Sequence, residues 1–287
     1  MASLIATIIG IIYALVGIGY YLGCALITAP SAHRGAKEAG WEMIRDSSTA
    51  VVVMAIAFFF MAIVDVVFRA VFRAPIGENA AGIAYSKLTS WLEGEKWGMF
   101  WAALKIEALP ILLDAIDALL PTGGGFLDLI ASFLRTAYMP WRILVASYTT
   151  ALALVDYWAN FLYSGYWILF LMFGALIYSI PKRIGRSAGA WLFAIGATYY
   201  IMLPFMPFFI DGLAGTITES LMQFPDKPPE DIISARILLM GLYDYNTMLL
   251  LRFVLFLLYQ LFIVSATLTI ARTMGATESP LLTGGLG

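Results

Sequence analysis

Long apolar stretches dominate this chain, and the polar segments between them are short. Seven stretches come close to the roughly 20 residues that a helix needs to cross a hydrocarbon core. They predict an all-α, polytopic transmembrane helical bundle that forms one membrane domain over residues 1–287. The predicted spans are residues 3–29, 51–72, 98–120, 141–162, 166–180, 188–213 and 247–271.

The third predicted span, residues 98–120, is the least apolar of the seven. Charged side chains interrupt it at Lys105, Glu107, Asp114 and Asp117, and Pro110 removes a backbone donor. Three alternatives stay open for this segment: it crosses the membrane, it enters and returns, or it lies flat at the surface. If it does not cross, everything before it changes side.

Residues 141–180 are almost continuously apolar. One straight helix of this length would measure about 60 Å, twice the usual core thickness. We therefore expect two spans, divided at Tyr163, Ser164 and Gly165.

Three further segments are expected outside the spans. Residues 31–47 are polar and predict a connection, with Ser48 and Thr49 available to cap the next helix. Residues 73–96 mix charges with tryptophan, which predicts an interfacial loop or an amphipathic helix, and residues 126–138 predict a short helix near the surface. Hinges are expected at Gly123, Gly124, Gly125, Pro204 and Pro207.

The composition leaves little room for a soluble catalytic domain, since 61% of the residues are hydrophobic and only 13% are charged. Cys24 is the only cysteine, so neither an intrachain disulfide nor a thiolate metal cluster can form. His33 is the only histidine, so no zinc site with a pair of histidines can form. The chain also lacks a Walker A sequence. These observations predict a protein that is not an enzyme and that has no cofactor or metal.

Charged groups inside apolar spans are costly and usually face a bundle interior, a water-filled path or a partner. Asp156 and Asn160 lie one turn apart, so they predict either a polar contact between helices or the lining of a passage. We expect Asp211, near a span end, to reach water, and Arg252 to extend outward from the start of its span. The candidates for passage or helix contacts are Asp65, Glu107, Asp114, Asp117, Asp156 and Asn160.

Glu107, Asp114 and Asp117 share one face of a helix at 100° per residue. This acidic stripe is either the solvated face of an interfacial helix or a wall that attracts cations. A wall of this sign would repel DNA, which counts against a DNA pore formed by this helix.

Basic residues are biased towards one side. For seven spans with the N terminus outside, nine Lys and Arg residues fall on the cytoplasmic side and six on the other. Lys182, Arg183, Arg186 and Arg272 belong to the cytoplasmic group, where they either signal topology or contact a partner or phosphates.

Two segments at this cytoplasmic side carry a resemblance. They are residues 181–191, PKRIGRSAGAW, and residues 271–275, ARTMG. Here the chain resembles the TrbL superfamily, the polytopic channel subunit of type IV secretion systems related to VirB-six, and in particular its CedA-type archaeal relatives in DNA import. The resemblance implies a conduit in the cytoplasmic membrane, working in an oligomeric complex with small two-span membrane subunits and a separate hexameric ATPase. The scarcity of Asn and Gln, five residues in all, fits a thermophile.

Three hypotheses for function follow. The first is a non-enzymatic conduit or scaffold for DNA transfer, with DNA in transit. The second is a secondary transporter of a small ion or solute that uses the buried carboxylates and the proline-broken sixth span. The third is a purely structural assembly factor.

Overall fold

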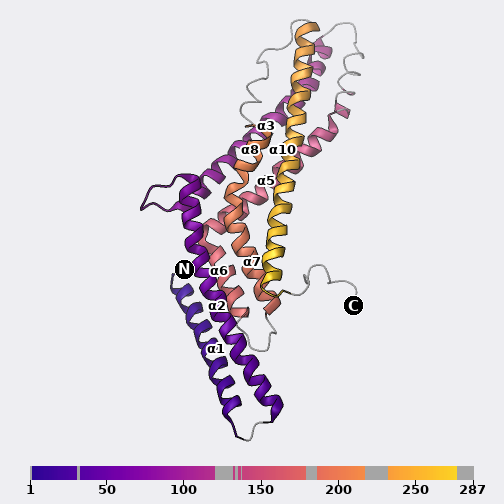
Figure 1. Cartoon of the computed structure of the whole chain (residues 1–287). Helices are drawn as coiled ribbons and strands as arrows, with labels where there is room; N and C mark the ends of the chain where they lie inside the picture. The colour runs from indigo at the N-terminus through magenta and orange to yellow at the C-terminus, as the bar shows by residue number, and fades with distance from the viewer. Residues whose placement is uncertain are drawn as a thin grey trace. The chain divides into compact units, whose positions relative to one another are not determined.

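Every element described in the structure, a computed structural model (Figure 1), is helical. The structure describes residues 2–30, 33–119, 132, 135–136, 138–178, 186–216 and 232–276. The all-α prediction is confirmed. Five helical segments are long and apolar enough to span a membrane, and the predicted number of seven spans is not confirmed.

The contacts divide the chain into two compact units. The first unit comprises Met1–Tyr85, Asn160–Pro204 and Leu261–Gly287, and the second unit comprises Ser86–Ala159 and Phe205–Gln260. Several long helices contribute to both units, and each unit is described by itself below.

In the first unit, helices α1 (Ala2–Thr28) and α2 (Arg34–Phe72) lie side by side (Figure 1). Their backbones approach closely at Gly23 and Gly40, where a Cβ on Gly23 would lie 2.8 Å from the Gly40 carbonyl oxygen. Small residues permit this kind of packing between membrane helices.

The prediction of a polar connection over residues 31–47 is wrong, because α2 begins at Arg34 after an extended His33. Residues 36–45 consist mainly of strong helix formers, including alanine, lysine, glutamate and methionine, and they contain no proline. Polarity alone therefore misplaced the start of the helix, and Ser48 and Thr49 lie inside it.

Helices α6 (Trp167–Tyr178) and α7 (Arg186–Met202) form the second close pair of the first unit. Gly174 and Gly189 lie at the crossing, and a Cβ on Gly189 would lie 2.5 Å from the Tyr178 amide nitrogen. The core beside them consists of small and aromatic side chains from α6 and α7, including Phe193, Ala190 and Ala194.

The second unit contains most of α3 (Ala80–Leu119), α5 (Met139–Phe161), α8 (Met206–Ala214) and the first part of α10 (Ile232–Thr273). Helix α3 joins the expected interfacial segment 73–96 to the expected span 98–120 and continues through Pro110. It is not among the five apolar candidates, because of its charges. Helix α10 begins at Ile232, well before the predicted residue 247, since residues 232–246 contain no proline and many helix formers.

The predicted fourth and fifth spans belong to one helical segment, Met139–Tyr178. A π-helical turn, η1 (Leu162–Tyr166), replaces the expected reversal, and only Gly165 within it departs from helical angles, with φ of 93°. At the predicted proline hinge, a short 3₁₀ turn, η3 (Leu203–Phe205), contains Pro204, and Pro207 lies in the first turn of α8. The predicted glycine hinge at Gly123, Gly124 and Gly125 lies outside the described residues, as does most of residues 126–138.

Candidate functional site

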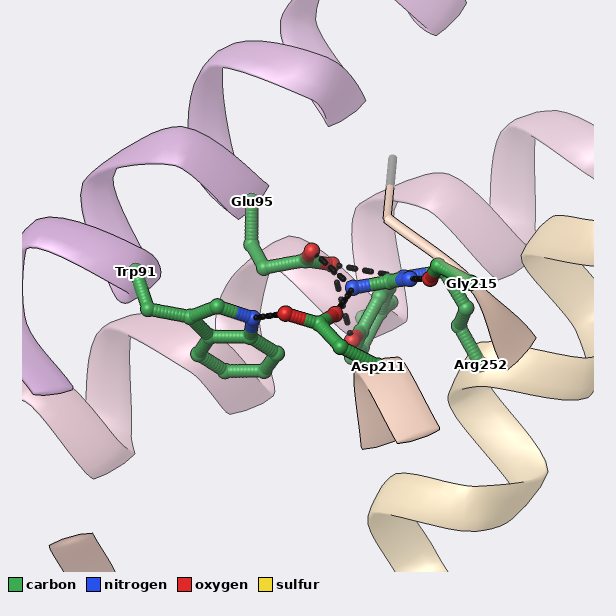
Figure 2. Close-up of polar contacts among 6 residues, drawn as sticks. Trp91, Glu95, Asp211, Gly215 and Arg252 are labelled. Carbon is green, nitrogen blue, oxygen red and sulfur yellow. Dashed lines mark hydrogen bonds and ion pairs between the residues drawn. The ribbon is translucent and has the colours of Figure 1, made fainter. Parts of the chain in front are cut away.

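A charge cluster lies inside the second unit, where α3, α8 and α10 contribute Glu95, Asp211 and Arg252 (Figure 2). Arg252 is completely buried and Glu95 is 1% exposed, whereas the Asp211 side chain is 26% exposed. Arg252 donates through Nε to Glu95 Oε2 at 3.2 Å and through Nη2 to Asp211 Oδ1 at 2.6 Å and to Glu95 Oε1. One guanidinium thus joins carboxylates from two other helices.

Three further groups complete the cluster. Trp91 Nε1 donates to Asp211 Oδ2 at 2.9 Å, as Figure 2 shows, and the Tyr148 hydroxyl of α5 lies 3.2 Å from Glu95 Oε2. Arg252 Nη1 donates to the carbonyl of Gly215, which follows the end of α8 with φ of 73°. Trp91 precedes Glu95 by one helical turn, so both side chains emerge from the same face of α3.

Each charged side chain of this cluster is stable in its buried position only because the others are present. A buried charge without a partner costs several kcal/mol, so removal of one member leaves the remaining ones in an unfavourable environment. Burial raises the pKa of the Glu95 carboxyl above its ordinary value, and the Arg252 charge opposes that rise. The cluster therefore links α3 and α8 to α10 through the single positive charge of Arg252.

Two more ion pairs join α3 to α5 within the second unit. Lys96 Nζ contacts Asp156 Oδ2, and Arg142 Nε lies 3.1 Å from Glu107 Oε1. A cavity of about 650 Å³ lies between these pairs, lined mainly by apolar side chains of both helices. Asp156 and Glu107 thus contact cations on a neighbouring helix.

The other predicted passage residues have more local surroundings. Asp65 pairs with Arg69 one turn later on α2, at 2.7 Å, and the Asn160 carbonyl accepts a hydrogen bond from Ser164 at 2.8 Å. Asp114 and Asp117 lie on α3, but their side chains are outside the described part of the structure. Of the six predicted residues, Glu107 and Asp156 thus belong to the contacts between α3 and α5 in the second unit.

Two of the four predicted basic residues lie at helix ends of the first unit. Arg186 opens α7 and Arg272 lies in the last turn of α10, while Lys182 and Arg183 lie outside the described residues. Arg186 Nε donates to the Tyr178 hydroxyl at 3.0 Å, and that hydroxyl donates to the Met274 carbonyl at 3.0 Å. This chain of contacts connects the end of α6, the start of α7 and the end of α10.

Sequence reasoning missed the charge cluster. The expectations that Arg252 extends outward and that Asp211 only reaches water are wrong, because both bind inside the second unit. The sequence predicts an interfacial position for Glu95, because it belongs to the segment 73–96, which mixes charges with tryptophan. A usable signal existed in the lone arginine within an apolar run, which requires a carboxylate somewhere in the bundle.

Within the described residues, no three His, Cys, Asp or Glu side chains are grouped as metal ligands. No protein-family model matches the chain, and neither a curated protein nor a solved structure does. Interpretation of function therefore depends on the residues themselves.

Proposed function

We propose that this protein is a non-enzymatic subunit of a type IV secretion-like machine that imports DNA through the cytoplasmic membrane. It acts as a conduit or scaffold, with its N terminus outside and its C terminus inside. Its partners are small two-span membrane subunits and a separate hexameric ATPase that moves the DNA.

One observation supports this proposal above the others. The two segments that carry the resemblance, around residues 186–191 and 271–275, contact each other through Arg186, Tyr178 and Met274. Gly275 lies beside Arg186, since a Cβ on it would be 3.1 Å from Arg186 Nε, and its φ of 92° favours glycine at this position. Segments about 90 residues apart in the chain thus meet at the start of α7 and the end of α10, which supports a shared contact with a partner or with phosphates.

The pairing of Glu107 weakens an electrostatic argument against the proposal. An acidic stripe on α3 would repel DNA, but Glu107 of that stripe lies 3.1 Å from Arg142 Nε. The potential that DNA would meet near these positions is less negative than the sequence alone indicates.

The test is deletion of the gene followed by measurement of DNA transfer between cells. We expect transfer to fall to background, and to return when the wild-type gene is supplied. Complementation with Arg186→Ala is expected to restore transfer poorly, whereas Arg34→Ala, at a 94% exposed position, restores it fully. Unchanged DNA uptake in the deletion strain would contradict the proposal.

The charge cluster favours a second candidate, a secondary transporter of a small ion or solute. Its carboxylates lie beside a helix interrupted by η3, and interrupted helices build many substrate sites. Saturable, proton-coupled solute flux into liposomes that contain the purified protein would favour this candidate. The transporter hypothesis also requires that Asp156→Asn abolishes this flux. A purely structural assembly factor would show partner binding and no flux.

A further inference from the structure

Three large aromatic side chains of α3 form a patch that points away from the protein. Trp97, Phe100 and Trp101 are 62%, 50% and 49% exposed, and their spacing of three and four residues places them on one face of the helix. The Phe100 ring lies edge-to-face against both indoles, with ring centroids 5.5 Å and 6.0 Å apart. Met99 and Ala102, on the opposite face, are buried. We call the three exposed side chains the aromatic patch.

An exposed group of this size needs contact with something other than water. Single exposed apolar residues are common on protein surfaces, but contiguous patches mark contacts with another protein or with a membrane. A tryptophan ring has a large apolar surface and one N–H donor, so it is most stable where an apolar phase meets a polar one. The position of the patch relative to the membrane boundary decides which contact applies.

The charge cluster beside the patch marks that boundary. Asp211 lies three residues before the end of the candidate span Arg186–Ala214, and Arg252 lies six residues after the start of the candidate span Asn246–Thr273. These spans contain 29 and 28 residues, so each measures about 42–44 Å. That length matches a bilayer of about 40–45 Å with its headgroups, so the span ends lie at the headgroup surface. Asp211 and Arg252 therefore lie about 5–9 Å below that surface.

Glu95 connects the patch to this level of the bilayer. It contacts Arg252 on α10, and Arg252 also contacts Asp211 on α8. Trp97 follows Glu95 by two residues and Trp101 by six, so the patch extends between about 3 and 9 Å from Glu95 along α3. The patch thus lies at the layer where phospholipid headgroups meet hydrocarbon. A charge cluster at this depth is also less costly than one at the bilayer centre.

We propose that the aromatic patch anchors α3 in the interfacial layer of the phospholipid bilayer. The indole rings of Trp97 and Trp101 lie between headgroups and hydrocarbon, and Phe100 contacts the acyl chains between them. The patch holds the neighbouring charge cluster at a fixed depth. This inference rests on the membrane location of the protein and not on DNA transfer.

The test uses the full chain, purified and reconstituted without other proteins into phosphatidylcholine liposomes. Tryptophan emission is measured with lipid brominated near the glycerol end of its chains, with lipid brominated near the chain ends, and with iodide in the water. The double variant Trp97→Phe/Trp101→Phe removes two of the eight tryptophans, so we expect the loss of about a quarter or more of the emission that shallow bromines quench. The emission that iodide or deep bromines quench changes little. Trp191→Phe, which removes a tryptophan packed against the core of the first unit, is the matched control and leaves shallow quenching unchanged.

Three results would overturn the proposal. Loss of mainly iodide-quenched emission in the double variant places the patch in water, loss of mainly deep-quenched emission places it in the hydrocarbon core, and loss of neither kind places it against protein. If the double variant does not fold, the two single variants are measured separately, and each is expected to remove part of the shallow-quenched emission. Because DNA uptake is not measured, failure of this test leaves the proposed function untouched.

Discussion

Arg252 and Glu95, 157 residues apart in the chain, form an ion pair inside the second unit in which both side chains are almost completely hidden from solvent. Asp211 contacts the same guanidinium at 2.6 Å from a third helix. The Arg252–Glu95 pair joins α10 to α3, and the contact of Arg252 with Asp211 adds α8. These contacts stabilise the packing, because a buried charge without a partner is unfavourable in an apolar environment.

The first prediction concerns the stability of this pair. Arg252→Met leaves the buried Glu95 without a cation, so it is expected to lower the free energy of unfolding by about 3–5 kcal/mol. Glu95→Gln leaves Asp211 on the Arg252 guanidinium and is expected to cost less. The midpoint of thermal unfolding in detergent checks this, with Arg34→Ala as an exposed-pair control that shows little change. The double variant should lose less than the sum of the two single losses. Additive losses would show that the two residues do not act as a pair.

The second prediction separates stability from transport at Asp156. Asp156→Asn removes a charge from the half-buried contact with Lys96 and is expected to cost less than either change at the Arg252–Glu95 pair, about 1–2 kcal/mol. A conduit or scaffold for DNA keeps DNA transfer between cells in this variant once it is folded. Loss of saturable, proton-coupled solute flux into liposomes in a folded, normally expressed Asp156→Asn protein would instead favour the transporter.

The third prediction concerns the glycine contact between α6 and α7. Gly189→Ala places a Cβ 2.5 Å from the Tyr178 backbone nitrogen, so the helices must separate, and we expect destabilisation of about 1–3 kcal/mol. Gly212→Ala has open space around its Cβ and should be neutral or up to about 1 kcal/mol stabilising, as alanine favours helix. If both variants unfold at the same temperature, the close approach of α6 and α7 is wrong.

The fourth prediction concerns the π-helical turn. Gly165 has φ of 93°, which an L-residue adopts only with strain, so Gly165→Ala is expected to destabilise the protein by about 1–2 kcal/mol. Gly17→Ala, which meets open space at an ordinary helical position, is the control in the same thermal assay. A gain in stability for Gly165→Ala would indicate a regular helix through this position.

Much of the fold could be predicted from the sequence, for a physical reason. Long apolar runs leave a helix as the way to satisfy backbone groups in lipid. The division predicted at Tyr163, Ser164 and Gly165 coincides with a kink at Gly165 within one helical segment. The ends of the helices could not be predicted as well. Residues 34–47 are polar and yet helical, because helix propensity acts independently of hydropathy. Residues 232–246 are largely apolar and contain no proline, so they continue α10 ahead of the predicted start at residue 247.

The candidate site was less accessible to sequence reasoning. The sequence predicts passage or helix contacts for Asp156 and Glu107. It does not predict their partners Lys96 and Arg142, because each partner lies on the other helix of the α3–α5 pair and no spacing rule connects them. Glu95 and Arg252 were missed because the pairing of residues 157 positions apart depends on how the helices cross. A lone arginine in an apolar run indicates that a partner exists, but it does not indicate which carboxylate.

We infer that lipid surrounds these helices, and extraction of cell membranes tests this inference most directly. After washing at alkaline pH in carbonate, the full-length chain is expected to remain in the membrane pellet and to enter solution only when detergent is added. Recovery of the chain in the wash as a folded monomer without detergent would contradict the account.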